Sequence, residues 1–186
     1  LSGSGFVEVF DSLETSATSW YRAYAENTAG SQSAYTNPVF FVESGGGTFP
    51  YCTAKVSSRG CVPTISGVGT PSMSSSSPFF LNANQVHNNQ FGILVYAYAP
   101  DFKPFMGGTL CLGFPLKRVT AVATGGNGTG QDCSGVLSYD FNTWIASGKD
   151  KGLASGLTLY AQWWYRDSQD GFGAGLTDGL QFTIQP

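Results

Sequence analysis

The sequence predicts an all-β protein: an antiparallel β-sandwich or jelly roll, fastened by disulfides, with a β-hairpin extension at its N-terminus. Three observations lead to this fold class. Short aromatic or alternating runs recur along the 186 residues, and Gly or Pro interrupts every candidate helix before its apolar residues repeat over about ten positions. The chain also has four cysteines and only 11% charged residues, a composition typical of exported domains.

Ten strands are expected, separated by linkers rich in Gly and Ser. In chain order they span residues 5–9, 19–27, 34–42, 63–69, 79–84, 92–98, 108–113, 136–141, 158–166 and 180–184. One short helix is expected over residues 140–147, because Phe141, Trp144 and Ile145 share a helical face and Gly148 ends it. Short strands at this spacing are typical of an antiparallel sandwich.

The chain is expected to divide at a glycine-rich linker, residues 45–49, because consecutive glycines lose the most backbone entropy and offer no side chain to pack. Residues 1–44 are interpreted as a β-hairpin extension around the turn 27–30, or the tail of a preceding domain. An isolated hairpin is marginal in water, so it must dock in cis or on another chain. Residues 50–186 hold the four cysteines and form the sandwich domain. The abrupt start without a signal sequence suggests a processed piece of a longer polypeptide.

The four cysteines, Cys52, Cys61, Cys111 and Cys133, are expected to form two disulfides. Of the three connectivities that four cysteines allow, separation along the chain favours Cys52 with Cys61 and Cys111 with Cys133. Each bridge would contribute about 3 kcal/mol by the loop-entropy relation. Zinc is disfavoured, because the spacings are not those of CxxC pairs and the only histidine is far away along the chain.

A set of motifs extends over about three quarters of the chain. It opens with YCTAKVSSRGCVP (51–63), continues through FGILVY (91–96) and WWYRD (163–167), and closes with LTDGLQFTIQP (176–186). This set resembles a C-terminal module of large secreted proteins of environmental bacteria, a family of unsettled function. The resemblance implies an extracellular accessory region. Residues 1–44 are similar, more distantly, to the closing strand pair of secreted metallohydrolase or fibronectin-like domains.

Composition excludes two classes of partner. The formal net charge is −3 and the isoelectric point is near 4.9, so the chain has no basic field for nucleic acid phosphates or anionic lipids. The longest apolar runs have about eight residues, whereas a membrane-spanning helix needs about 20. We therefore expect no nucleic acid partner and no membrane insertion.

Few residues of the types that act as catalytic acids, bases or nucleophiles stand in recognisable motifs, so we expect that the protein is not an enzyme. His87 lies in a polar stretch that is interpreted as an exposed turn, without a GxSxG elbow. The glycine-rich run 125–130 lacks the lysine and helix of a phosphate loop, and is expected to be a flexible loop enclosed by a disulfide. Four carboxylates are the candidates for a glycosidase pair, but no spacing singles out two of them: Asp140, Asp167, Asp170 and Asp178.

The expected strand 158–166 carries the best binding candidate. Alternation puts Leu157, Leu159, Ala161, Trp163 and Tyr165 on a core face. The other face presents a platform of aromatic, amide and guanidinium groups suited to stacking on sugar rings: Tyr160, Gln162, Trp164 and Arg166. The alternative, which we favour from sequence, is that a loop or the N-terminal hairpin covers Trp164.

The loop after this strand is a candidate for calcium, with Asp167 and Asp170 as ligands. An ordinary turn is the favoured alternative, because the fuller ligand spacing of a calcium loop is missing. No other cofactor is expected.

Two functional hypotheses follow, both for a secreted or cell-surface protein. The first is a non-catalytic accessory module that binds glycan or cell-surface polymer through an aromatic face. The second is a structural subunit that self-associates when the hairpin of residues 1–44 adds a strand to a neighbouring molecule.

Overall fold

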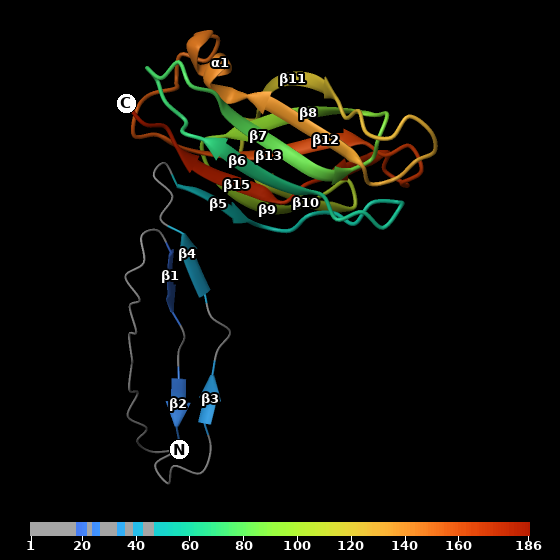
Figure 1. Cartoon of the computed structure of the whole chain (residues 1–186), viewed down its shortest axis with the longest axis horizontal. Helices are drawn as coiled ribbons and strands as arrows, with labels where there is room; N and C mark the ends of the chain where they lie inside the picture. The colour runs from blue at the N-terminus through green and yellow to red at the C-terminus, as the bar shows by residue number, and fades with distance from the viewer. Residues whose placement is uncertain (1–17, 22–23, 27–32, 36–38, 43–46) are drawn as a thin grey trace. The chain divides into compact units, whose positions relative to one another are not determined.

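The computed structural model describes residues 47–186 and four short strands before them, which are β1 (Thr18–Tyr21), β2 (Tyr24–Glu26), β3 (Ser33–Tyr35) and β4 (Val39–Val42). The chain forms two compact units, Leu1–Gly47 and Thr48–Pro186, and Figure 1 shows the elements of each. In the first unit β1 pairs with β4 and β2 pairs with β3, both antiparallel. The expected strand 5–9 and turn 27–30 lie outside the described residues.

The second unit is an antiparallel β-sandwich, so the predicted fold class is confirmed. Its larger sheet has the strand order β11 (Lys117–Ala123), β8 (Phe91–Ala97), β13 (Thr158–Arg166), β15 (Gly179–Thr183), β5 (Thr48–Tyr51), with β14 (Ala174–Leu176) also paired to β13. The smaller sheet has the order β12 (Gly135–Asp140), β7 (Phe79–Val86), β6 (Thr64–Gly69).

The main core fills the space between these two sheets. The inward face of β13 supplies Leu159, Ala161, Trp163 and Tyr165, all buried, and β7 supplies Phe79 and Leu81 from the opposite sheet. The predicted core face of β13 is therefore confirmed, except that Leu157 is only partly buried. Each large apolar side chain buried in this way stabilises the fold by about 1.5–3 kcal/mol.

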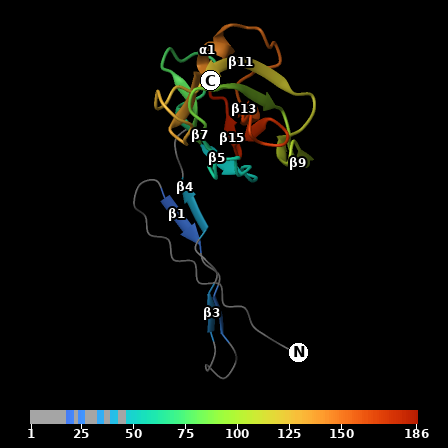
Figure 2. The same cartoon turned by 90° about the vertical axis from the view of Figure 1, so that its right-hand side faces the viewer.

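A third layer lies on the outer face of the larger sheet. It is the covering hairpin, formed by β9 (Pro100–Phe105) and β10 (Gly108–Leu112). Leu110 and Leu112 from this hairpin pack with Val95 and Ala97 of β8 in a second apolar cluster. Figure 2 shows the layers in order, with β7 on one side of β13 and β15, and β9 on the other.

The short helix was predicted correctly. It is α1 (Phe141–Ala146), and it begins where the Asp140 carboxylate accepts a hydrogen bond from the Asn142 backbone N–H at 3.1 Å. Phe141 and Ile145 face the core. The chain turns away at Gly148, whose φ of 61° lies in the left-handed region that favours glycine.

Four strands of the sandwich were missed from the sequence: β5, β9, β11 and β14. β5 begins at Thr48, so residues 48–49 belong to a strand and not to the predicted linker. β9 contains Pro100 and Pro104, which argue against a central strand but are tolerated at a sheet edge. These strands lie at sheet edges or pair with only one neighbour, where alternation of buried and exposed residues is weak.

The predicted cysteine pairing is wrong. Cys52 bonds to Cys111 with Cα atoms 6.0 Å apart, and Cys61 bonds to Cys133 with Cα atoms 5.7 Å apart. The physical reason is that the end of β5 lies beside β10, where the Tyr51 hydroxyl donates to the Cys111 carbonyl at 2.5 Å. Strand packing, and not separation along the chain, brings the sulfurs together.

Thiol counting distinguishes the two connectivities. The double variant Cys52→Ala with Cys111→Ala removes one bridge and should leave no free thiol, while Cys52→Ala with Cys61→Ala breaks both bridges and should leave two. Thiol titration of the unfolded variants measures this. By loop entropy the first variant loses about 4 kcal/mol of stability. Two thiols in the first variant and none in the second would restore the sequential pairing.

Candidate functional site

On the outer face of the larger sheet, residues that lie opposite one another on neighbouring strands form rows across β11, β8 and β13. Trp164 of β13 lies opposite Ile93 of β8, and Ile93 lies opposite Ala121 of β11. One row further, Phe91 of β8 lies opposite Ala123 of β11. Because Tyr165 lies opposite Gly92, the next position of β13, Arg166, is the neighbour of Phe91.

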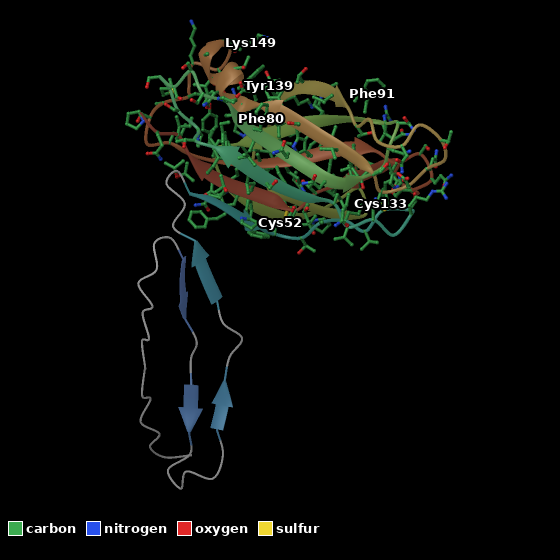
Figure 3. All side chains as sticks on the ribbon, in the orientation of Figure 1. Cys52, Phe80, Phe91, Cys133, Tyr139 and Lys149 are labelled. Carbon is green, nitrogen blue, oxygen red and sulfur yellow. A yellow bond between two sulfur atoms is a disulfide. The ribbon has the colours of Figure 1, made fainter. Side chains whose placement is uncertain are left out.

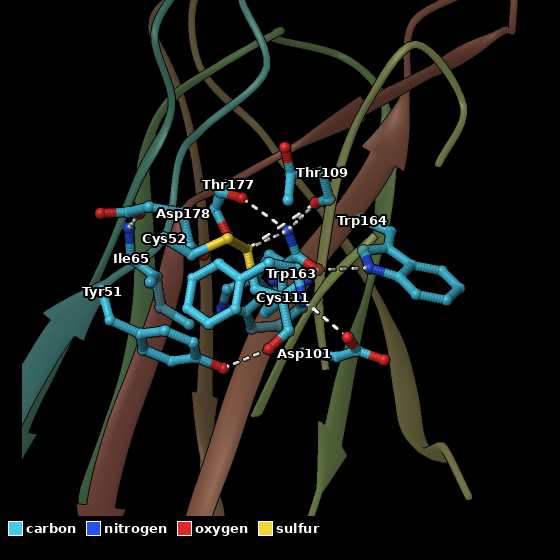
Figure 4. Close-up of a disulfide and its surroundings, with 12 residues drawn as sticks. Tyr51, Cys52, Ile65, Asp101, Thr109, Cys111, Trp163, Trp164, Thr177 and Asp178 are labelled. Carbon is cyan, nitrogen blue, oxygen red and sulfur yellow. Dashed lines mark hydrogen bonds between the residues drawn. A yellow bond between two sulfur atoms is a disulfide. The ribbon is translucent and has the colours of Figure 1, made fainter. Parts of the chain in front are cut away.

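Gln162 is not on the surface, so the predicted platform is wrong at this residue. Its side chain is 0% exposed and joins β13 to the covering hairpin. Its amide nitrogen donates to the carbonyls of Thr109 at 3.0 Å and Thr177 at 2.8 Å, and its oxygen accepts from the Cys111 N–H at 3.2 Å. Figure 4 shows two of its partners, Thr109 and Thr177, beside the Cys52–Cys111 disulfide.

Tyr160 lies under neighbouring aromatic rings. Its ring meets that of Tyr51 edge-on, with centroids 5.6 Å apart, and Tyr51 meets Phe102 of β9 in the same way at 5.9 Å. Burial, and to a smaller degree the nearby Tyr160, raises the pKa of Tyr51. Tyr160 is therefore part of the packing beneath the covering hairpin, partly buried, and contributes little surface to a ligand.

Trp164 is half-buried against the covering hairpin. Its ring lies 4.9 Å from the ring of Phe105 at an interplanar angle of 40°, and its Nε1 donates to the Gln162 oxygen at 3.3 Å. The alternative that a segment covers Trp164 is thus right in part, and the segment described here is β9. Arg166, two residues further on, is exposed.

Beyond the covering hairpin the outer face is open. We call this area the open strip, and Ile93 and the half-buried Trp164 form its floor. Its exposed residues come from three adjacent strands, and they are Phe91, Arg118, Ala121, Ala123 and Arg166. Arg118 lies at the margin of the covering hairpin, because its neighbour Val95 is buried under that hairpin.

Phe91 is the aromatic that sequence reasoning missed, although it is 64% exposed and lies beside β11 in Figure 3. The expected strand began one residue later. Extending the alternation of Ile93 and Val95 backwards would have found it.

The loop that follows β13 has protein donors on both of its predicted calcium ligands. Asp167 is fully buried and accepts from the Ser58 N–H at 2.8 Å and the Ser58 hydroxyl at 2.5 Å. Asp170 pairs with the Lys55 ammonium at 2.5 Å. Within the residues that the structure describes, no group of three or more His, Cys, Asp or Glu is arranged for a metal. The favoured alternative, an ordinary turn, fits these contacts.

Both aspartates have a lowered pKa. For Asp167, burial opposes ionisation, but the hydrogen bonds from Ser58 and the proximity of His87 outweigh it. For Asp170, the hydrogen bond from Lys55 is the main cause. The other two candidate carboxylates also accept backbone N–H groups: Asp140 from Phe79, and Asp178 from Ile65 at 2.7 Å. Burial raises the pKa of Asp178.

Lys55, which the sequence did not single out, is buried, and its ammonium group donates three hydrogen bonds. Its ammonium donates to the carbonyls of Met106 at 2.6 Å and Ala174 at 2.8 Å, as well as to Asp170. It thereby ties the turn of the covering hairpin to the loop after β13. A buried charge with this many partners is structural.

His87 is buried at 4% exposure, so the prediction of an exposed histidine is wrong. Its Nε2 lies 2.9 Å from the Ser57 hydroxyl and its Nδ1 lies 3.6 Å from Asp167. These residue types also form the Ser-His-Asp triad of hydrolases. Here Ser57 is only 6% exposed, and its hydroxyl accepts the N–H groups of Cys61 at 3.0 Å and Arg59 at 3.3 Å. These contacts use the Ser57 hydroxyl to hold loops together.

No family model, curated protein or solved structure matches this chain. The resemblance to a secreted bacterial module therefore stays a prediction. Among the helices in the described part of the chain, none has the length and apolarity to cross a membrane.

Replacing Gln162 by Leu should destabilise the protein by about 3 kcal/mol, because the change leaves buried backbone groups without partners at about 1–3 kcal/mol each. Urea unfolding measures the difference. Gln181→Leu, on the half-exposed outer face of β15, is the matched control and should change stability little. Equal effects of the two variants would contradict the role of Gln162.

Acid should weaken the fold through Asp167. Its native pKa is below the unfolded value of about 3.9, so its contribution to stability is complete above that pH and is lost as pH falls through the native pKa. Asp167→Asn should be less stable than wild type at pH 7, and the gap should shrink as the pH falls. Unfolding titrations at several pH values measure it. Asp101→Asn, in an exposed ion pair with Lys103, should show a small gap throughout.

Proposed function

We propose that the chain is a non-catalytic extracellular accessory module that binds glycan or cell-surface polymer through the open strip. The observation that carries this proposal is the solvent-exposed ring of Phe91 beside Arg166, on a sheet face whose floor includes Trp164. Aromatic rings on a flat sheet face stack on the apolar faces of sugar rings. Arginine supplies fixed hydrogen-bond donors beside them.

Other features of the chain support an extracellular setting. Both disulfides are formed and the described residues contain no free cysteine, and disulfides persist in oxidising compartments. The low charge and the Ser, Thr, Asn and Gly content support the same proposal. The candidate catalytic residues have structural contacts, since the candidate carboxylates and His87 form hydrogen bonds that hold the backbone and the loops.

Self-assembly by strand addition, the second hypothesis, has less support in the described residues. The edge strands β5 and β11 of the larger sheet contact β6 and β12 of the smaller one, which restricts access to their free edges. The free edge of β9 contains two prolines, which cannot donate to an added strand. We therefore favour ligand binding.

Phe91→Ala should abolish retention on the polymers that hold the native protein, because the exposed stacking ring is lost while the core is untouched. Affinity electrophoresis against a panel of soluble and insoluble polysaccharides measures retention. The matched control is Phe80→Ala, the same change at a ring 38% exposed on β7 of the other sheet (Figure 3). Retention should survive it.

Two results would overturn the proposal. One is a native protein that no polysaccharide retains, and the other is a Phe91→Ala variant that is retained as strongly as the native protein. Light scattering on the same samples checks that retention is not caused by self-association.

A further inference from the structure

The open strip carries two guanidinium groups and no carboxylate. Arg118 and Arg166 are both exposed. Within residues 47–186 the basic members of ion pairs are Lys55, His87, Lys103 and Lys117, and neither arginine of the strip is among them. The remaining exposed residues of the strip are one phenylalanine and two alanines. Among residues 47–186, the positive charge on this surface therefore has no ion-pair partner.

The two arginines are spaced for an extended ligand. Arg118 lies opposite Val95, and Val95 lies opposite Gln162, four residues before Arg166 on β13. With strands about 4.8 Å apart and a rise of about 3.3 Å per residue, the two Cα atoms are about 16 Å apart. That distance covers several sugar rings of a polymer and exceeds one monosaccharide.

The alanines make the path between the arginines shallow. Ala121 and Ala123 lie along β11 between Arg118 and the position of Phe91. A bulge in β11 between Arg118 and Ala121 changes the register there, and bulges redirect neighbouring side chains. A polymer can therefore lie along β11 against the Phe91 ring without meeting a large side chain from that strand.

Residues 47–186 carry a small positive net charge, although the whole chain is acidic. Residues 47–186 contain eight Lys and Arg, seven Asp and no Glu, so the net charge of −3 comes from the residues before them. Of the two carboxylates on the loop that follows Arg166, Asp170 is paired with the Lys55 ammonium, and Asp167 is buried and accepts from Ser58.

We propose that the open strip binds acidic polysaccharides, which bear carboxylate or sulfate groups, more tightly than neutral ones. This inference rests on the proposed glycan-binding function. The exposed ring of Phe91 stacks on a sugar ring. Arg118 and Arg166 each present a planar fork of donors that matches a carboxylate or sulfate in a bidentate pair. Two arginines at this spacing bind anionic groups on different sugar units of the same chain.

The test compares polymers that differ only in charge. The full chain is titrated with polygalacturonate and its fully methyl-esterified form, and with dextran sulfate and dextran, by affinity electrophoresis. We expect binding to each acidic polymer at least about tenfold tighter than to its neutral form, since one charge-assisted hydrogen bond contributes about 1.5–3 kcal/mol. Added NaCl should weaken the acidic binding by screening.

Single-charge variants locate the site. Arg118→Gln and Arg166→Gln should each weaken binding to polygalacturonate about tenfold and leave the unfolding midpoint unchanged, because both side chains are exposed. Lys149→Gln removes the same charge beyond α1, at the other end of the sandwich from Phe91 (Figure 3), and should leave binding unchanged. An equal effect of Lys149→Gln would mean nonspecific attraction and overturn the inference.

The outcomes separate this inference from the proposed function. Equal binding to acidic and neutral polymers overturns the selection of acidic chains and leaves glycan binding standing. No binding to any polymer overturns both. Tighter binding to polyuridylate than to polygalacturonate overturns the inference and assigns the strip to nucleic acid.

Discussion

The buried amide of Gln162 and the disulfide beside it are the constraint on which the functional surface depends. A buried amide in an apolar layer is stable only when its donors and acceptor are matched. Gln162 finds its partners on β10 and on the chain after β14, and Cys52–Cys111 fastens the same place covalently. These contacts therefore fix the position of the covering hairpin on the outer face. That position determines which part of the face is covered and which part is exposed.

A second set of polar contacts fixes the loops at one end of the sandwich. Ser57, Ser58, His87 and Asp167 form one network, and Lys55 and Asp170 form another. Cys61–Cys133 links the segment that carries Ser57 and Ser58 to the loop before β12. The chain has few ionisable groups, and several of them are buried and make structural hydrogen bonds and ion pairs. The same residue types in an accessible cleft would suggest a hydrolase, so burial and backbone partners, more than residue identity, argue for a structural role.

The open strip follows from these two constraints together. In the covering hairpin, β9 ends at Phe105 against Trp164, and Lys55 and Ser58 bind the loop after β13. Phe91 and Arg166 stay exposed beside these two segments, on strands whose inward residues anchor them in the main core. A rigid sheet that presents exposed side chains is a pre-organised surface, which limits the entropy lost when a polymer binds.

The sequence by itself determined the all-β class, the helix at α1, the core face of β13 and the presence of structural cysteines. Each of these depends on local properties, such as alternation, capping and composition, that a short window contains. Only the tertiary structure decided how the cysteines pair, that Gln162 and His87 are buried, and that Phe91 joins Arg166. Cys111 lies 51 residues before Gln162 in the chain, yet the two share a hydrogen bond. Alternation says that a residue faces outward from its strand, but a distant segment determines whether that outward face meets solvent or another layer of protein.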